Sequence, residues 1–85
     1  MSFFTTAFLI EKYGLRTDLE ALSVILDTTP ANLRRRISAG DFEIPTYLDG
    51  GKRWADIRDV DAYLDACRQQ AQRAHQQARG ASLPA

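Results

Sequence analysis

The chain has 85 residues, with 11 basic and 11 acidic side chains and a formal net charge of zero. A domain of this length buries only about 60–65% of the surface that its unfolded chain exposes, which argues against a deep cleft for a small-molecule substrate. The single cysteine excludes an internal disulfide framework and a cysteine-based zinc site. No run approaches the roughly 18 apolar residues that span a bilayer, and the first residues lack the basic and long apolar regions of a secretory signal. We therefore expect a soluble cytoplasmic protein that is not an enzyme and does not bind a membrane.

The zero total hides an uneven distribution of charge along the chain. Residues 1–27 contain two basic and four acidic side chains, residues 28–58 contain six and four, and residues 59–85 contain three of each. The basic side chains of the middle part gather in two clusters, Arg34-Arg35-Arg36 and Lys52-Arg53. Phosphate binding depends on such local clusters and not on the total charge. The zero net charge therefore does not exclude a nucleic-acid partner.

Two helices are expected in the first part of the chain. Apolar residues followed by Gly14 favour a first helix over residues 5–13, because glycine is common just beyond a helix end. Thr17-Asp18-Leu19-Glu20 has the pattern of a capping box, which predicts a second helix over residues 18–26.

A third helix follows after only two or three residues. Thr29 is expected to be its N-cap and Pro30 its first residue, and Gly40 ends it after Ala39. Two helices separated by so short a turn are typical of a helix-turn-helix. In the third helix Leu33 and Ile37 can anchor one face, and the opposite face carries Ala31, Asn32, Arg35 and Ser38.

A hairpin and a last helix complete the predicted elements. Residues 45–48 and 52–55 are predicted strands joined by a tight turn at Asp49-Gly50. Asp56 is expected to be the N-cap of the last helix. Its apolar face is formed by Ile57, Val60, Tyr63, Leu64 and Cys67. Residues 69–85 form a polar helical extension that projects from the body, with a disordered end from Gly80 onward.

Other chemistry-bearing side chains favour packing over a reactive site. We expect Phe42, Tyr47 and Trp54 to pack in the core or on the hairpin, and Cys67 to be a small core residue. His75 has no second metal ligand near it in the sequence. No acid–base pair, nucleophile–histidine pair or phosphate-binding glycine loop is present. We therefore expect no catalytic residues, no metal and no cofactor.

The order of elements is that of a winged helix-turn-helix, a mainly α fold with a small β-hairpin, over residues 1–68. In this fold the second helix of the helix-turn-helix enters the major groove and the hairpin contacts the flanking backbone. The expected DNA-binding residues are Thr28, Thr29, Asn32, Arg34, Arg35, Arg36, Lys52 and Arg53.

Each of these residues has an expected role. Three consecutive helical side chains span about 200° and cannot all enter one groove. Arg35 is the expected base-reading residue, because arginine with guanine is the commonest specific contact. Arg34 and Arg36 are expected to reach phosphates, or one of them pairs with an acidic neighbour. Asn32 either reads adenine, binds phosphate or remains solvated. Thr28 and Thr29 are expected to form the turn and the N-cap, and their hydroxyls can also touch phosphate. Lys52 and Arg53 are expected to contact the DNA backbone or the minor groove, or to protect an edge strand from aggregation.

Several stretches resemble a known group of DNA-binding proteins. The pattern from Leu22-Ser23 through Thr28-Thr29, Leu33, Arg35 and Ile37 to Gly40-Asp41-Phe42 resembles the DNA-binding unit of MerR-like and AlpA-like regulators and of phage excisionases. The PrtN-like pyocin activators resemble the chain more closely, at Thr6-Ala7-Phe8-Leu9, Tyr13-Gly14, Thr29-Pro30, Arg34-Arg35-Arg36, Ile44-Pro45-Thr46 and Ile57-x-Asp59-Val60-x-x-Tyr63. The segment Asp49 to Trp54 is closer to the excisionase and AlpA pattern.

The resemblance implies a sequence-specific DNA-binding regulator of transcription from a phage or mobile element, associated with the bacterial nucleoid. The alternative that it implies is an excisionase, which bends attachment-site DNA for an integrase. A winged-helix module that binds protein is a third reading, motivated by the neutral total. One such module buries only about 600–1,000 Å² on DNA, so we expect self-association as a dimer or head-to-tail on DNA. Integrase or RNA polymerase are the further partners implied.

Overall fold

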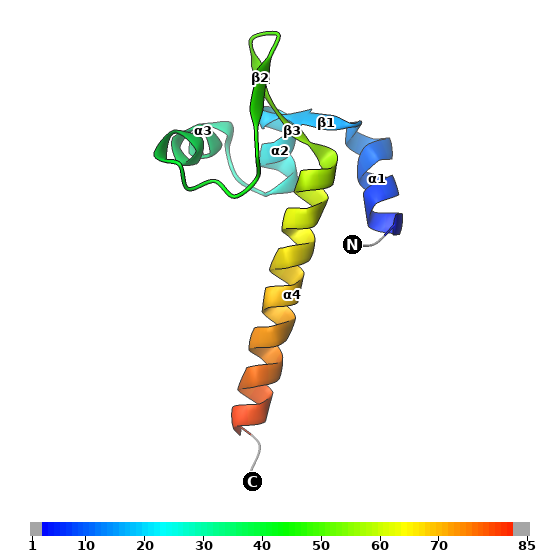
Figure 1. The fold of residues 1–85 in the computed structure, drawn as a ribbon, viewed down its shortest axis with the longest axis vertical. Coiled ribbons are helices and arrows are strands. Elements are labelled where there is room, and N and C mark those ends of the chain that lie inside the picture. Colours follow the sequence, from blue (N-terminus) through cyan, green and yellow to red (C-terminus); the bar gives the residue numbers. More distant parts are fainter. Residues whose placement is uncertain (1–2, 83–85) are drawn as a thin grey trace.

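The computed structural model describes residues 3–82, which form helices around a small antiparallel sheet (Figure 1). The elements in chain order are α1 (Phe3–Tyr13), β1 (Arg16–Asp18), α2 (Leu19–Ile25), α3 (Pro30–Ala39), β2 (Tyr47–Asp49), β3 (Lys52–Asp56) and α4 (Ile57–Ser82). The strand order in the sheet is β1-β3-β2, so β3 pairs on both sides. The prediction of a mainly helical chain with a small antiparallel hairpin is confirmed.

Strand β1 has no counterpart among the elements predicted from the sequence. Thr17 was expected to cap a helix, but it lies in β1 opposite Ala55, is only 1% exposed, and its hydroxyl donates to the Ala55 carbonyl at 3.5 Å. Asp18 caps α2 instead, since its carboxylate accepts the backbone N–H of Ala21 at 2.9 Å. The capping pattern therefore predicts the cap one residue too early, because pairing with a strand far along the chain leaves no local signal.

Helices α2 and α3 form the expected pair, but α2 ends at Ile25 and the four residues 26–29 join the helices, in place of the two or three predicted. The Thr29 hydroxyl accepts the backbone N–H of Asn32 at 3.1 Å, which confirms it as the N-cap of α3. Gly40 ends this helix with φ 76°, a left-handed conformation that favours glycine. Leu33 is fully buried, so α3 is held to the body along one face and leaves the other face open.

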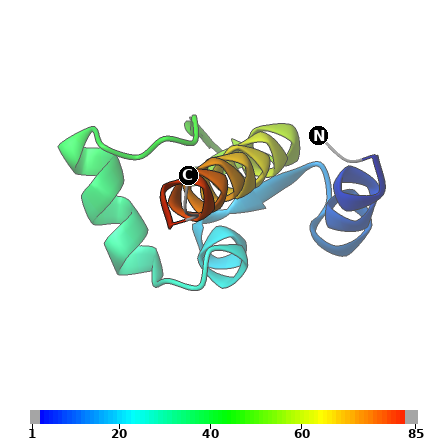
Figure 2. The same cartoon turned by 90° about the horizontal axis from the view of Figure 1, so that it is seen from below.

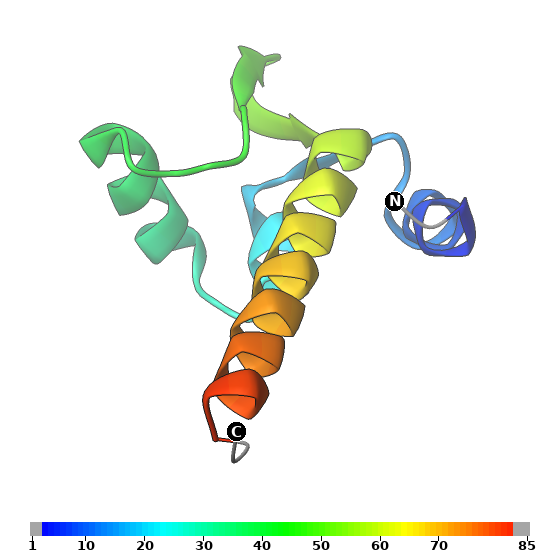
Figure 3. The same cartoon turned by 60° about the horizontal axis from the view of Figure 1, so that its bottom comes forward.

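The core draws side chains from both the helices and the sheet. Its buried apolar residues are Leu9, Leu19, Leu22, Leu33, Ile44, Ala55, Ile57 and Val60. Helix α1 is also fixed by a polar contact, because the Thr6 hydroxyl donates to the buried carboxylate of Asp61 on α4. Figure 3 shows α1 beside the first turns of α4, with β1 leading from α1 toward α2. Helices α1 and α3 lie at opposite ends of the body (Figure 2).

The hairpin turns one residue later than predicted. Gly50 and Gly51 have φ values of 61° and 80°, and two such residues form the turn that matches the twist of a two-residue hairpin. Strand β2 begins at Tyr47 and not at Pro45, which has no N–H for a strand ladder. The hairpin therefore presents Asp49 and Lys52 as the last pair before its tip.

Helix α4 continues far beyond the body (Figure 1). Its first turns are buried through Ile57 and Val60, but every side chain from residue 66 to residue 80 is exposed. Cys67 was expected in the core and is exposed, because the helix has left the body at that point. Gly80 was expected to begin a disordered end, yet the helix continues to Ser82; the remaining residues, 83–85, lie outside the part of the chain described.

The carboxylate of Asp56 lies at the N-terminus of α4 and interacts there with Arg58. The Arg58 side chain donates to the Asp56 carboxylate at 3.0 and 2.7 Å, and this lowers the pKa of Asp56 from 3.8 to about 2. The same carboxylate accepts the backbone N–H of Arg58 at 2.8 Å, as an N-cap does. A lowered carboxyl pKa contributes stability above the unfolded value, and that contribution is lost as the pH falls through the folded value.

We expect Asp56→Ala to lower the free energy of unfolding by about 1 kcal/mol at pH 7. The difference from the wild type should shrink as the pH falls from about 4 to about 2, in urea denaturation series at each pH. Glu43→Ala, at an exposed loop carboxylate, is the control. A destabilisation that stays constant down to pH 2 would contradict this role of Asp56.

Candidate nucleic-acid interface

Helix α3 and the β2–β3 hairpin lie together at one end of the molecule, and α4 extends in the other direction (Figure 1). An open groove of about 360 Å³ lies between α3, the hairpin and the start of α2. Arg34 lines it from α3, Leu48 and Arg53 line it from the hairpin, and Asp18 and Glu20 line it from the body. The groove is thus open to solvent and has cations on two opposing elements.

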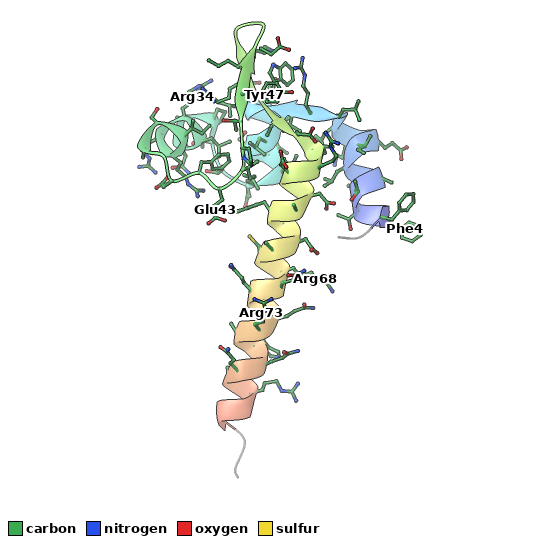
Figure 4. All side chains as sticks on the ribbon, viewed as in Figure 1. Phe4, Arg34, Glu43, Tyr47, Arg68 and Arg73 are labelled. Carbon is green, nitrogen blue, oxygen red and sulfur yellow. The ribbon has the colours of Figure 1, made fainter. Side chains whose placement is uncertain are left out.

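The exposed face of α3 carries two of the three consecutive arginines. Arg34 and Arg35 are exposed, whereas Leu33 on the face toward the body is buried. Figure 4 shows Arg34 on the side of α3 nearest the hairpin. Within residues 3–82 the Arg34 guanidinium forms no hydrogen bond or ion pair. All of its N–H donors are therefore available to an external acceptor.

A chain of hydrogen bonds orders the first turn of α3 and its exposed arginine. The Asn32 amide N–H donates to the Thr28 hydroxyl at 2.9 Å, and the Arg35 guanidinium donates to the Asn32 side-chain oxygen. Both the amide nitrogen and the amide oxygen of Asn32 are therefore hydrogen-bonded. Arg35 uses one of its N–H groups in this contact, and its other N–H groups can donate to an external acceptor. The arrangement holds the planar fork of Arg35 over the N-terminal part of α3, where it can meet a base edge or a phosphate.

Arg36 is directed away from this face. Its guanidinium lies 5.2 Å from the Phe42 ring centroid and donates to the Asp41 carbonyl at 3.4 Å. Its Nε is 3.8 Å from the Asp41 carboxylate. Of the two roles expected for Arg36, the geometry favours pairing with an acidic neighbour, and Arg36 supports the end of α3.

Lys52 and Arg53 do not form one cluster, because adjacent strand residues point to opposite faces of a sheet. Lys52 lies on the outer face, with its Nζ 3.7 Å from the Asp18 carboxylate. Arg53 lies on the same face as the buried Ala55 and donates to the Thr46 hydroxyl at 2.8 Å. Arg53 therefore shares its face of the sheet with the core, and both Lys52 and Arg53 line the groove beside α3.

The outer face of the sheet holds Arg16, which is not among the residues predicted to bind DNA. Arg16 on β1 lies 4.0 Å from the Trp54 ring centroid, donates to the Asp49 carboxylate at 2.7 Å and reaches the Tyr47 hydroxyl at 3.4 Å. The hydrogen bonds to Tyr47 and Asp49 raise the pKa of Arg16 above its usual value. No sequence signal marks Arg16, because its partners are about 30 residues or more away along the chain.

The expected packing roles of the aromatic residues are met in different ways. Phe42 is partly buried against the core, and Trp54 is half-buried beneath Arg16 and donates its indole N–H to the Asp49 carbonyl at 2.9 Å. Tyr47 is 45% exposed on the hairpin.

Other kinds of site are not apparent in the described chain. Over residues 3–82, no three side chains of the metal-ligating types come together, and His75 lies exposed on α4. None of the described helices combines the length and apolar character needed to cross a bilayer.

The role of Thr29 as the N-cap of α3 can be tested by substitution. Removing its hydroxyl in Thr29→Ala should lower the free energy of unfolding by about 1 kcal/mol, within a range of roughly 0.5–2. Thr29→Ser keeps the oxygen that accepts the Asn32 N–H and should retain most of the stability. Urea denaturation followed by circular dichroism measures both variants. Equal stability of the alanine and serine variants would contradict the role of the cap.

Compared with known proteins, the chain matches no protein-family model, no curated protein and no solved structure.

Proposed function

We propose that the chain is a winged helix-turn-helix protein that binds double-stranded DNA in a sequence-specific manner and regulates transcription in a phage or mobile element. The observation that carries the proposal is the open groove with Arg34 on one wall and Arg53 on the other. Two cations on separate elements, facing one open channel, suit the sugar–phosphate backbone of a duplex. The source in a phage or mobile element and the regulatory role rest on the family resemblance of the sequence.

The dimensions of α3 agree with this function. Its ten residues give a length of about 15 Å, which suits a major groove roughly 12 Å wide. In this pose Arg35 reads a base edge, Arg34 contacts phosphate, and the hairpin, as the wing, brings Arg53 and Lys52 to the flanking backbone. Asn32 acts by holding Arg35, because both ends of its amide are already bonded. Thr28 and Thr29 order the turn that presents the helix.

Several copies are needed for useful affinity. A single module of this size buries about 600–1,000 Å² on DNA, at the low end for specific complexes. We propose that the protein acts as a dimer or as neighbouring copies on one duplex, with RNA polymerase as the partner of a regulator.

A second candidate function is an excisionase-like factor that lines up in several copies and bends DNA for an integrase. Helix α1 favours it, because Phe3, Phe4 and Phe8 are 80%, 82% and 59% exposed at the end of the body opposite α3 (Figure 2). An exposed apolar face suits a contact with a neighbouring copy, and a row of copies forms where this face packs on a different surface of the next copy. Several copies on direct repeats, with a bend, would favour this candidate; one dimer on one palindrome without a bend favours the regulator.

Arg35 is the first residue to test. On a site identified by footprinting the DNA upstream of the protein's own gene, Arg35→Ala should weaken specific binding by about 1–3 kcal/mol and relax one base position. Arg68→Ala on α4, which is distant from α3 (Figure 4), removes the same charge and is the control. Fluorescence anisotropy with the site and with single-base variants measures both effects. Unchanged specific binding of Arg35→Ala would exclude it as the base-reading residue.

Arg34 gives a different expected signature. Arg34→Ala should weaken specific and non-specific DNA alike and reduce the slope of log K against log salt by about 1, because one phosphate contact is lost. Titrations of the wild type and the variant over a series of salt concentrations measure the slope. Complete absence of DNA binding by the wild type, or binding that does not respond to salt, would instead favour a module that binds protein.

A further inference from the structure

The hairpin depends on few contacts for its orientation. Every residue of β2 is exposed, and β2 pairs only with β3. An isolated two-stranded hairpin is at best marginally stable in water. Strand β3 continues into the body through the buried Ala55, but the hairpin tip lies beyond that anchor. Contacts that cross from the body to the hairpin therefore decide where its cations lie relative to α3.

Arg16 makes such a contact across the whole width of the sheet. It lies on β1, at the edge of the sheet opposite β2, with β3 between them. Its guanidinium packs over Trp54 of β3 and reaches the Asp49 carboxylate of β2 at 2.7 Å. The Trp54 indole N–H donates to the Asp49 carbonyl at 2.9 Å, so the side chain and the backbone of Asp49 are held together. One guanidinium thus links all three strands.

We infer that Arg16 is a positioning residue, which sets the orientation of the hairpin against α3 and so allows both to contact one DNA duplex. The inference rests on the proposed function for its DNA part. Arg16 acts through Trp54 and Asp49 and not by touching DNA. A planar fork that stacks on an aromatic ring while bonding a carboxylate is a property of arginine that lysine does not reproduce.

The positioning role can first be tested without DNA. Trp54 is the single tryptophan of the chain, so tryptophan fluorescence reports on the surroundings of this one ring, against which Arg16 packs. Arg16→Ala should shift the emission to longer wavelength and speed the amide hydrogen exchange of residues 47–54. The matched control is Arg58→Ala, which breaks an Arg–Asp pair of the same 2.7 Å length at the start of α4, beyond the residues of β3 that pair with β2. Emission and exchange identical to the wild type in Arg16→Ala would overturn the inference.

The DNA experiment distinguishes positioning from a direct charge contact. Arg16→Ala and Arg16→Lys should both lose about tenfold in affinity, with footprint protection lost at the flanks and kept at the centre. A double-mutant cycle with Arg53→Ala should be non-additive, because both changes act through the hairpin. Wild-type affinity of Arg16→Lys, or independent effects of Arg16 and Arg53, would overturn the inference. If the wild type binds no DNA, the proposed function fails, and the Trp54 and exchange measurements still decide whether Arg16 positions the hairpin.

Discussion

The pairing of β3 with strands on both of its sides is the constraint on which the rest of the structure depends. On one side β1 places the buried Thr17 against Ala55 and ties the sheet to the core. On the other side β2 continues beyond the body and forms the hairpin. One strand therefore contributes a core residue at its end and Lys52 at the hairpin tip. The cations of the hairpin reach out from the body only because the other half of β3 is fixed within it.

The cations of the candidate interface differ in how far the protein itself neutralises them. Lys52 faces Asp18, Arg16 faces Asp49 and Arg36 faces Asp41, whereas Arg34 has no such partner among the described residues. Exposed ion pairs of this kind contribute little to stability, typically below about 1 kcal/mol. Their effect is on the electrostatic potential, because each carboxylate reduces the attraction of its cation for phosphate. Acidic side chains therefore lie beside the basic ones on this surface, in a chain whose net charge is zero.

The sequence predicted those features whose causes are local. Thr29, Pro30 and Gly40 mark the ends of α3 by capping and backbone preferences within a few residues, and the structure agrees. The core role of Leu33 follows from helical spacing in the same way. Thr17 and Arg16 could not be interpreted correctly, because the strand and the side-chain contacts that define them are formed with residues 31 to 40 positions away.

The candidate site shows the same division between local and distant causes. The exposure of Arg35 follows from its position opposite Leu33 and Ile37 on one helix. The separation of Lys52 from Arg53 follows from strand alternation, but only once the register of the sheet is known. The prediction that Cys67 is buried was wrong, because the apolar face of a helix does not indicate where that helix leaves the body of the protein. The pairing of Arg36 with Asp41 could be recognised only once the conformation of the loop after α3 was known.

The exposed part of α4 has a consequence for how the protein melts. Residues 66–80 are in contact with solvent along their whole length, so local helix propensity and not burial keeps them helical. Isolated helices of about 12–15 residues are marginal in water and unwind gradually with temperature. The body should unfold in one cooperative transition, whereas this segment should lose helicity steadily below that transition. Calorimetric and circular-dichroism curves of the same sample will therefore not superimpose, and a single midpoint temperature will describe the body alone.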